Sequence, residues 1–155
     1  MRIGHGIDVH AFAEGRKLML GGVLIPHARG LAGHSDADAL IHALIDALLG
    51  AAALGDIGGM FPSSDERWRD AAGSELLALA SGRVRQSGYR IINVDSTVVA
   101  EAPKLSLYVP EMRAAIAHAA GIEMGAVSVK ATTSDALGFT GRHEGIAAFA
   151  VVLLE

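Results

Sequence analysis

The 155-residue chain contains no cysteine, and this absence excludes disulfide bonds, cysteine-based zinc ribbons and thiol catalysis. It also lacks the excess of basic residues that is typical of nucleic-acid-binding proteins, because the net charge is −4 and the lysines and arginines are scattered. We therefore expect no nucleic-acid partner. A phosphorylated ligand would need metal ions to supply much of the positive charge.

Long apolar runs are also missing. The longest, residues 43–54, is too short to cross a bilayer and contains Asp46. No basic segment followed by an apolar one stands at the N-terminus, so we expect neither export nor a membrane partner, and a cytoplasmic location. Apolar residues nevertheless make up 51% of the chain, which indicates large buried interfaces between subunits.

The length fits a single domain, residues 1–155. The spacing of apolar residues predicts helices over about 35–54, 74–86 and 109–120, and alternation with β-branched residues predicts strands over 2–12, 17–25, 89–100, 126–132 and 145–154. The first two strands are expected to pair as an antiparallel hairpin. We therefore predict an α+β fold, a mixed four-stranded sheet with an extra hairpin and with helices layered on one face.

The first helix is expected to begin at Ser35, whose hydroxyl can cap it, with Asp38 three residues on as in a capping box. Gly55 can end it. This interpretation explains the acid at position 38 without any function.

The first strand carries an aspartate and a histidine two residues apart, in the stretch GIDVHAF (6–12). Because side chains alternate along a strand, Asp8 and His10 share one face with two glycines, while the neighbouring apolar side chains point to the other face. One interpretation is a half-buried strand with a polar outer face. The other is a pair of metal ligands, which requires a third ligand from elsewhere in the chain.

His42 is the candidate for this third ligand. It stands between Asp38 and Asp46 at four-residue spacing along one edge of the first predicted helix. A histidine in this place can be purely structural. With Asp8 and His10, however, it completes two histidines and one carboxylate, and three protein ligands with an open fourth position are typical of catalytic zinc. Asp46, one turn later, could orient the His42 ring.

Seven stretches together resemble one known family: GHGIDVH (4–10), HSDAD (34–38), IHALIDALLGAAALGDIG (41–58), FPSSD (61–65), AEAPKL (100–105), KATTSD (130–135) and GFTGRHEGI (138–146). With them the chain is similar to the 2-C-methyl-D-erythritol 2,4-cyclodiphosphate synthase family over nearly its whole length. This resemblance implies an enzyme of the non-mevalonate isoprenoid pathway. Its substrate would be 4-diphosphocytidyl-2-C-methyl-D-erythritol 2-phosphate, whose 2-phosphate attacks the β-phosphorus, releases CMP and closes the cyclic diphosphate.

The resemblance also implies cofactors and an assembly. Asp8, His10 and His42 match zinc ligands, so we expect one zinc or a similar divalent transition metal per subunit, with a phosphate oxygen as fourth ligand. Magnesium or manganese would accompany the diphosphate. Asp135 stands where the family commonly has glutamate and could hold this second metal, directly or through water. The family assembles as a homotrimer with active sites at subunit interfaces.

The matched positions further imply the residues that contact the substrate. His34 and Thr133 match the catalytic pair that orients and stabilises the phosphates. Residues 56–58 match the segment that holds the methylerythritol portion, 61–65 a loop beside it, and 100–106 the cytosine pocket. The whole set is Asp8, Val9, His10, His34, Ser35, Asp56, Ile57, Gly58, Phe61, Pro62, Ser63, Ser64, Asp65, Ala100, Glu101, Ala102, Pro103, Lys104, Leu105, Ser106, Thr132, Thr133, Ser134, Asp135, Phe139 and Arg142.

The sequence departs from the family pattern at a few places besides Asp135. The loop at 61–65 is less acidic, which leaves the side chain of Ser63 without an assigned role, and Phe149 stands where some members carry an acid beside the threefold axis.

Two other functions stay open at this point. A metal-dependent phosphohydrolase would keep the metals, but no residue is evident as a base for water and the 100–106 stretch would be unexplained. A non-catalytic trimer that binds a nucleotide or an isoprenoid phosphate would explain the apolar composition but not an open three-ligand site.

Overall fold

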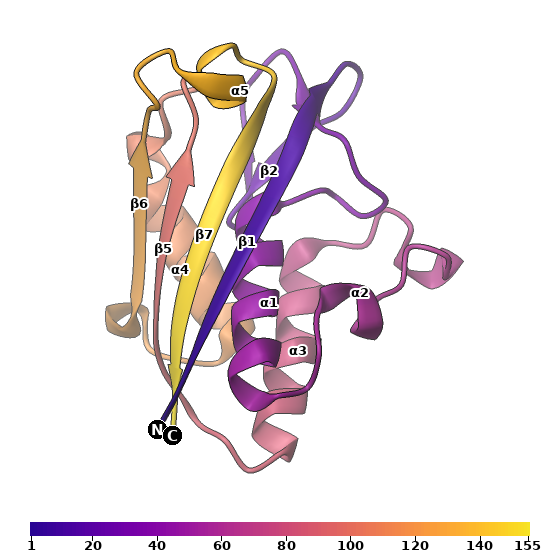
Figure 1. Ribbon diagram of the computed structural model, residues 1–155, viewed down its shortest axis with the longest axis vertical. Helices are drawn as coiled ribbons and strands as arrows, with labels where there is room; N and C mark the ends of the chain where they lie inside the picture. The colour runs from indigo at the N-terminus through magenta and orange to yellow at the C-terminus, as the bar shows by residue number, and fades with distance from the viewer.

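The computed structural model describes residues 1–155 as a mixed β-sheet with helices on one of its faces (Figure 1). The strands are β1 (Arg2–Ala13), β2 (Leu18–Leu20), β3 (Val23–Ile25), β4 (Gly30–Leu31), β5 (Ile91–Val99), β6 (Val127–Thr132) and β7 (Gly145–Leu154). Five of them form the main sheet, in the order β4-β1-β7-β5-β6. β7 pairs antiparallel with both β1 and β5, whereas β5 and β6 run parallel.

The prediction of a four-stranded sheet is wrong by one strand. The fifth is β4, a two-residue strand in which Leu31 pairs with Phe12 and Gly30 with Ala13 at the end of β1. A strand of two residues is too short to leave an alternating pattern, so the sequence contains no signal for it.

The expected hairpin between residues 2–12 and 17–25 is also wrong. β2 and β3 pair with each other instead and form a separate two-stranded sheet. The turn between them consists of Gly21 and Gly22, both with positive φ. Two consecutive residues in the left-handed region make a tight two-residue hairpin turn, and glycine adopts that region without strain.

The longer helices cover one face of the main sheet, as predicted. The helices are α1 (Ala39–Ala52), α2 (Ile57–Met60), α3 (Gly73–Gln86), α4 (Val109–Ala120) and α5 (Gly138–Gly141), with single 3₁₀ turns at η1 (Glu66–Trp68), η2 (Leu105–Leu107) and η3 (Met124–Ala126). α1 packs on β1 and β7, α4 packs on β6, and α3 lies against both helices (Figure 1). None of them is long and apolar enough to span a membrane.

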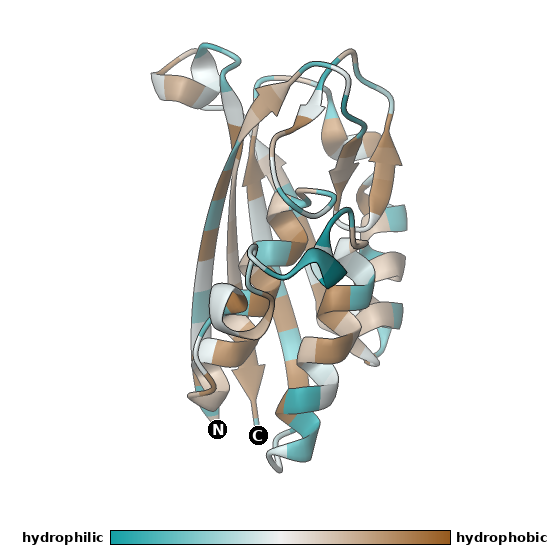
Figure 2. Ribbon diagram, turned by 90° about the vertical axis from the view of Figure 1, so that its right-hand side faces the viewer, coloured by the Kyte–Doolittle hydropathy of each residue, from teal (hydrophilic) through white to brown (hydrophobic).

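The apolar residues between sheet and helices form one continuous core of 38 buried residues, which accounts for a single domain. Figure 2 shows this distribution, with apolar residues along the strands and hydrophilic residues gathered on outlying turns.

α1 begins at Ala39, four residues later than expected, because Asp38 caps it. The carboxylate of Asp38 accepts a hydrogen bond from the amide of Ile41 at 3.0 Å. It also accepts from the amides of Gly21 and Gly22, at 2.9 and 2.6 Å, and so ties the β2–β3 turn to the helix. Burial raises the pKa of Asp38, and these amides oppose that rise. Ser35 is left free for another contact.

β1 and α1 approach each other closely at two glycines. A Cβ on Gly4 would lie 1.8 Å from the carbonyl oxygen of Ala47, and a Cβ on Gly6 would lie 2.0 Å from that of Ala43. Only glycine fits at either position, so the helix lies directly on the strand. The polar and glycine face of β1 is therefore its inner face, contrary to the interpretation as a strand with a polar outer face.

The other face of the main sheet has no helix over it and exposes large apolar side chains. We call this set the helix-free apolar face. It comprises Ile3, Ile7 and Val9 of β1 and Phe149 and Val151 of β7, which are 38 to 75% exposed.

Candidate metal centre and substrate pockets

Asp8, His10 and His42 converge at one point between β1 and α1. Oδ2 of Asp8 lies 2.8 Å from Nε2 of His10 and 3.0 Å from Nδ1 of His42, and the two nitrogens are 3.1 Å apart. No other group of three acids or imidazoles in the structure could hold a metal ion jointly. The prediction that these side chains meet is confirmed.

The geometry of the three groups fits a metal ion. Ligand atoms about 2.0 Å from a tetrahedral metal lie about 3.3 Å from one another, so the cluster needs to open by only a few tenths of an ångström. Each imidazole has its second nitrogen held: Nδ1 of His10 donates to the carbonyl of Ala32, and Nε2 of His42 forms a hydrogen bond of 3.0 Å with the hydroxyl of Ser35. Because a carbonyl can only accept, the first bond fixes the tautomer of His10 that leaves Nε2 free for a metal. A hydroxyl can donate or accept, so the second bond orients the His42 ring and lets Nε2 carry the proton when Nδ1 binds a metal.

The three groups shift one another's pKa. Burial raises the pKa of Asp8, but hydrogen bonds with His10 and His42 outweigh burial and leave this pKa well below its usual range. Burial lowers the pKa of His10, whereas the hydrogen bond and the charge of Asp8 reverse this effect and raise it overall. Asp8 is therefore ionised near neutral pH, and His10 is the group for which a proton and a metal compete.

Asp46 does not orient the His42 ring as predicted. Its Oδ1 accepts a hydrogen bond from the amide of Ile57 at 2.7 Å and ties α1 to the start of α2. The helical spacing places Asp46 one turn from His42, but the following loop supplies a backbone donor that takes the carboxylate. Ser35 orients His42 instead.

A pocket of about 190 Å³ opens beside the metal centre, between α1, α2 and η1. Its lining combines His42 with residues that the family resemblance matched to the contacts of the phosphates and of the methylerythritol portion. The lining residues are His34, Ser35, His42, Ile57, Gly58, Phe61, Ser63, Trp68 and Leu76. We call it the metal-side pocket.

Trp68 and Leu76 belong to the metal-side pocket but were missed by the sequence analysis. Trp68 contacts Phe61 edge to face, with ring centroids 5.0 Å apart. Its signal was available, because it is the only tryptophan of the chain and follows the 61–65 loop. Leu76 is part of the apolar stripe of α3 and carries no signal that separates it from a core residue.

The remaining residues of the 56–65 segment have local contacts. Asp56 caps α2 by accepting from the amide of Gly59 at 2.8 Å, and Asp65 forms an ion pair with Arg67 at 2.6 Å. Pro62 and Ser64 lie in the same turn without lining the pocket.

A second pocket, of about 430 Å³, lies at the C-terminal end of β6 and is lined by most of the residues expected to bind cytosine. It is lined by Ala100, Glu101, Pro103, Lys104, Leu105, Ser106, Ala131, Thr132 and Thr133. We call it the base-side pocket. Ala102 lies in the same turn and is joined to Pro103 by a cis peptide bond.

The two pockets of one chain lie at different strands of the sheet, the metal-side pocket near β1 and the base-side pocket at β6. β7 and β5 stand between β1 and β6, so three strand spacings, about 14 Å, separate these two strands. The expected catalytic pair is divided accordingly, with His34 in the metal-side pocket and Thr133 in the base-side pocket.

The other expected site residues lie around α5 and on β1. Asp135 is exposed, and its Oδ1 accepts from the Thr133 hydroxyl at 3.3 Å; it joins no second acid. Phe139 is 37% exposed, and Arg142 forms an ion pair with Glu144 at 2.8 Å. Val9 points away from the metal centre, on the helix-free apolar face.

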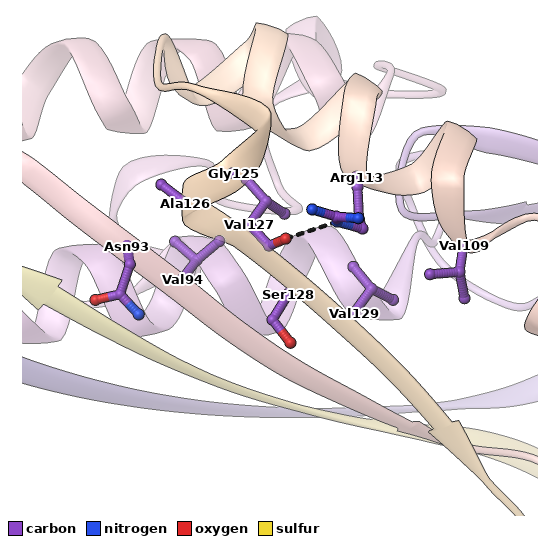
Figure 3. A pocket seen from close by; sticks show the side chains of 9 residues that line it. All are labelled: Asn93, Val94, Val109, Arg113, Gly125, Ala126, Val127, Ser128 and Val129. Carbon is purple, nitrogen blue, oxygen red and sulfur yellow. Dashed lines mark hydrogen bonds between the residues drawn. The ribbon is translucent and has the colours of Figure 1, made fainter.

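A further pocket, of about 370 Å³, lies between α4 and the outer edge of β6 (Figure 3). Arg113 closes one side of it and donates to the carbonyl of Val127 at 2.8 Å. Its lining contains no carboxylate or imidazole, so it offers no metal ligands and was not a candidate site.

Comparisons with known proteins agree with these features. A family model described as the YgbB family matches residues 1–155. The curated 2-C-methyl-D-erythritol 2,4-cyclodiphosphate synthase of Syntrophomonas wolfei is 57% identical over 155 residues, which cover 100% of this chain and 99% of that protein.

Solved structures are similar over the same range. The bifunctional IspDF from Campylobacter jejuni matches with a TM-score of 0.95 and 46% identity; the match covers 99% of this chain, which spans only 42% of that longer chain. A 2C-methyl-D-erythritol-2,4-cyclodiphosphate synthase in a CDP-bound form matches with a TM-score of 0.91 and 36% identity, covering 99% of this chain and 100% of that one.

Proposed function

The chain belongs to the YgbB family, and from this premise we propose how its residues carry out the reaction of its curated relatives. It is an enzyme of isoprenoid biosynthesis that converts 4-diphosphocytidyl-2-C-methyl-D-erythritol 2-phosphate to 2-C-methyl-D-erythritol 2,4-cyclodiphosphate and releases CMP. The observation that carries the assignment to a site is the convergence of Asp8, His10 and His42 beside a pocket.

The reaction sets two demands on the protein. The 2-phosphate must lie in line with the β-phosphorus of the same molecule, and the charges of several phosphates must be neutralised as the ring closes. Because attack is intramolecular, correct positioning alone lowers much of the barrier. The chain has few basic side chains at either pocket, so metal ions fit the second demand.

Zinc is the metal we assign to the Asp8, His10 and His42 centre. Two imidazoles, one carboxylate and an open fourth position suit this ion. When bound, it supplies a Lewis acid that polarises a phosphoryl oxygen. Anomalous scattering at the zinc edge should give a peak between the three side chains; a peak elsewhere, or zinc retained by His42→Ala, would contradict the assignment.

The metal-side pocket holds the reacting phosphates and the branched polyol. His34 and Ser35 line it, and an imidazole and a hydroxyl can donate to phosphate oxygens. The backbone at Ile57 and Gly58 faces the same space and suits the methylerythritol portion. Thr133 donates to the diphosphate from the other pocket.

The base-side pocket takes the cytidine. Backbone groups of residues 100–106 are able to read the edge of the base, and Lys104 can counter phosphate charge. A related synthase has been solved in a CDP-bound form, which supports a cytidine nucleotide as ligand.

Asp135 is proposed to hold magnesium or manganese at the diphosphate. Magnesium with phosphates usually keeps several waters and takes one or two carboxylates, so a single exposed aspartate is sufficient. We expect Asp135→Asn to weaken the magnesium dependence of CMP release while zinc stays bound, and Asp135→Glu to leave the reaction largely intact. Unchanged magnesium dependence in the asparagine variant would make Asp135 an ordinary loop acid.

A homotrimer with shared sites is proposed for two reasons. The metal-side and base-side pockets of one chain lie about 14 Å or more apart across the sheet, so a neighbouring chain is better placed to complete each site. The helix-free apolar face also requires a partner, because large apolar patches on a soluble protein mark interaction surfaces.

Subunit mixing tests the shared site. His42→Ala damages only the metal side, and Lys104→Ala together with Ser106→Ala damages only the base side. Refolding the two variants together should restore part of the activity, because some sites then combine two intact halves. Mixed oligomers that form without recovering activity would contradict sharing.

The reaction itself is tested by incubating the pure protein with the cytidylylated substrate. CMP release with a cyclic product is expected. Inorganic phosphate would indicate a phosphohydrolase, and neither product would indicate a binding protein. The cytoplasm remains the proposed location, to be checked by fractionation.

A further inference from the structure

Glu101, expected to contact the substrate, has its carboxylate engaged with the protein itself. Its Oε1 accepts hydrogen bonds from the amide of Ser134 at 2.9 Å and from the amide of Ala136 at 3.2 Å. These bonds join two segments that are more than thirty residues apart in the sequence, the turn after β5 and the loop after β6, which lie at the same end of the sheet (Figure 1).

Ser134 is the second member of this network. Its hydroxyl lies 3.1 Å from Oε1 of Glu101 and 2.8 Å from the carbonyl of Leu137, and it accepts a hydrogen bond from the Thr140 hydroxyl at 2.7 Å. The single hydroxyl proton of Ser134 is shared between Oε1 of Glu101 and the carbonyl of Leu137. The hydroxyl oxygen accepts the hydrogen bond from Thr140. The 134–137 loop is thus held from the β5 side by Glu101 and from the α5 side by Thr140.

The loop needs such support because its backbone is unfavourable. Asp135 and Ala136 are consecutive residues with positive φ, 52° and 63°, in a region that residues with a side chain rarely adopt. Gly141 packs against it so closely that a Cβ there would lie 2.1 Å from the carbonyl carbon of Ala136. Consecutive left-handed residues persist only where neighbouring contacts determine them.

The carboxylate is well suited to this task. The amide of Ser134, followed by that of Ala136, holds the pKa of Glu101 below its usual range, so the group is ionised near neutral pH. Backbone N–H groups that point to one anion form a compact anion-binding concavity. Here the carboxylate of Glu101 occupies that concavity, so the two amides are satisfied without a substrate phosphate.

We propose that Glu101 is a positioning residue that holds the 133–137 loop in its working shape and so couples the base-side pocket to the hydroxyl of Thr133. This inference rests on the proposed function. Thr133 immediately precedes the loop, while Glu101 lies in the turn that contacts the base. The carboxylate thus joins the turn that lines the base-side pocket to the segment that carries the Thr133 hydroxyl.

The test compares Glu101→Ala with Glu101→Gln. The amide oxygen of glutamine accepts the same two backbone N–H groups, so this variant should keep kcat within about threefold. The alanine variant releases the loop, and we expect kcat to fall by about 10- to 100-fold because the Thr133 hydroxyl is misplaced. KM and the Kd for CDP should change by less than about threefold in both variants, since the base contacts themselves are kept.

Hydrogen exchange supplies a readout that does not depend on turnover. Amides in residues 132–137 should exchange faster in Glu101→Ala than in the wild type, with the rest of the chain unchanged, and Glu101→Gln should restore protection. Glu123→Ala is the matched control, since this exposed glutamate makes no side-chain hydrogen bond in the structure. Ser134→Ala should lower kcat in the same direction and add little to Glu101→Ala in the double variant.

Several results would overturn the proposal. A raised KM or CDP Kd with unchanged kcat would make Glu101 a contact for the base only. Unchanged kcat and unchanged exchange would leave it without a role. If the wild type releases no CMP, the proposed function fails. The positioning role is then still decided by two measurements, the hydrogen exchange of residues 132–137 and the Kd for CDP. If Glu101→Ala does not fold, Ser134→Ala takes its place, and wild-type kcat with wild-type exchange in that variant overturns the proposal.

Discussion

At the scale of single residues, the metal centre depends on the hydrogen bonds that hold the second nitrogen of each ligand imidazole. Nε2 of His42 can donate to one acceptor, the hydroxyl of Ser35, while its Nδ1 faces Asp8. An imidazole that lacks this partner can rotate or change tautomer, and both changes weaken a metal bond.

We expect Ser35→Ala to lower the affinity for zinc by about 10- to 100-fold, the usual effect of losing such a partner. Competitive zinc titration measures it. Ser81→Ala is the matched control, because Ser81 is also buried but its hydroxyl has no hydrogen-bond partner. That variant should keep the zinc affinity and raise the free energy of unfolding by up to about 1 kcal/mol. Wild-type zinc affinity in Ser35→Ala would show that His42 is oriented by its ring packing alone.

The pH dependence of zinc binding follows from His10. Zinc requires the neutral imidazole, and the pKa of His10 is raised above 6.5, so zinc affinity should fall as the pH drops through this raised pKa, by about tenfold per unit below it. Without metal, the pair of Asp8 with protonated His10 stabilises the fold fully below 6.5, and this contribution is lost as the pH rises through the raised pKa. The difference in Tm between zinc-loaded and EDTA-treated protein should therefore widen from pH 6 to pH 8. A constant difference would contradict competition at His10.

At the scale of elements, the metal centre depends on how closely α1 lies on β1. Gly6→Ala would place a Cβ 2.0 Å from a backbone oxygen of α1, and backbone cannot yield as a flexible side chain would. We expect a loss of about 2–3 kcal/mol in the free energy of unfolding and weaker zinc binding, because the strand and the helix each carry ligands.

Gly50→Ala in the same helix is the control for this prediction. Nothing lies within 4 Å of a Cβ at Gly50, so this change should stabilise α1 by about 0.5–1 kcal/mol through helix propensity. Urea unfolding of both variants measures the two effects. Equal stability of the Gly6 and Gly50 variants would show that α1 can shift at little cost.

Elements with strong local signals could be predicted from the sequence. Elements whose bounds depend on which distant group bonds a given side chain could not. α4 has the predicted range because Gly121 ends it in the left-handed conformation that glycine favours. The start of α1 was misplaced because Ser35 and Asp38 are both good caps, and only the nearby β2–β3 turn selects Asp38. The same holds for Asp46, which a backbone amide beyond the helix engages.

Strand parity and helical spacing are both local, so the sequence could nominate Asp8, His10 and His42 as metal ligands, and the family resemblance implied that they form one site. Two facts about the site could not be predicted. The sequence does not reveal that the base-side turn and the 134–137 loop share a carboxylate, since Glu101 and Ser134 are far apart in the chain. Nor does it distinguish Leu76 of the metal-side pocket from the other apolar residues of α3.

At the scale of the whole molecule, the helix-free apolar face is the surface proposed to join the subunits. Ile7 and Phe149 are direct partners across β1 and β7, so they form the middle of that face. A carboxylate at Ile7 would be buried among the apolar side chains of this face, which carries a large penalty unless the charge is paired. We expect Ile7→Glu to yield monomers that bind zinc but release CMP at less than about a tenth of the wild-type rate.

Leu79→Glu is the control for the assembly prediction. Leu79 is 49% exposed on α3, close to the 50% of Ile7, but lies away from the sheet. Light scattering coupled to size exclusion should show an unchanged oligomer for this variant. An Ile7→Glu protein that remains oligomeric and active would show that the subunits meet through another surface.

The separation of the two pockets across the sheet has a consequence for mixtures of defective and normal chains. In a ring of three chains that share sites between neighbours, each chain contributes one half to each of two sites. A chain with a defect in one pocket disables one site when it enters a ring with two normal chains. A chain with defects in both pockets disables two of the three sites, so it also lowers the activity of the normal chains with which it assembles.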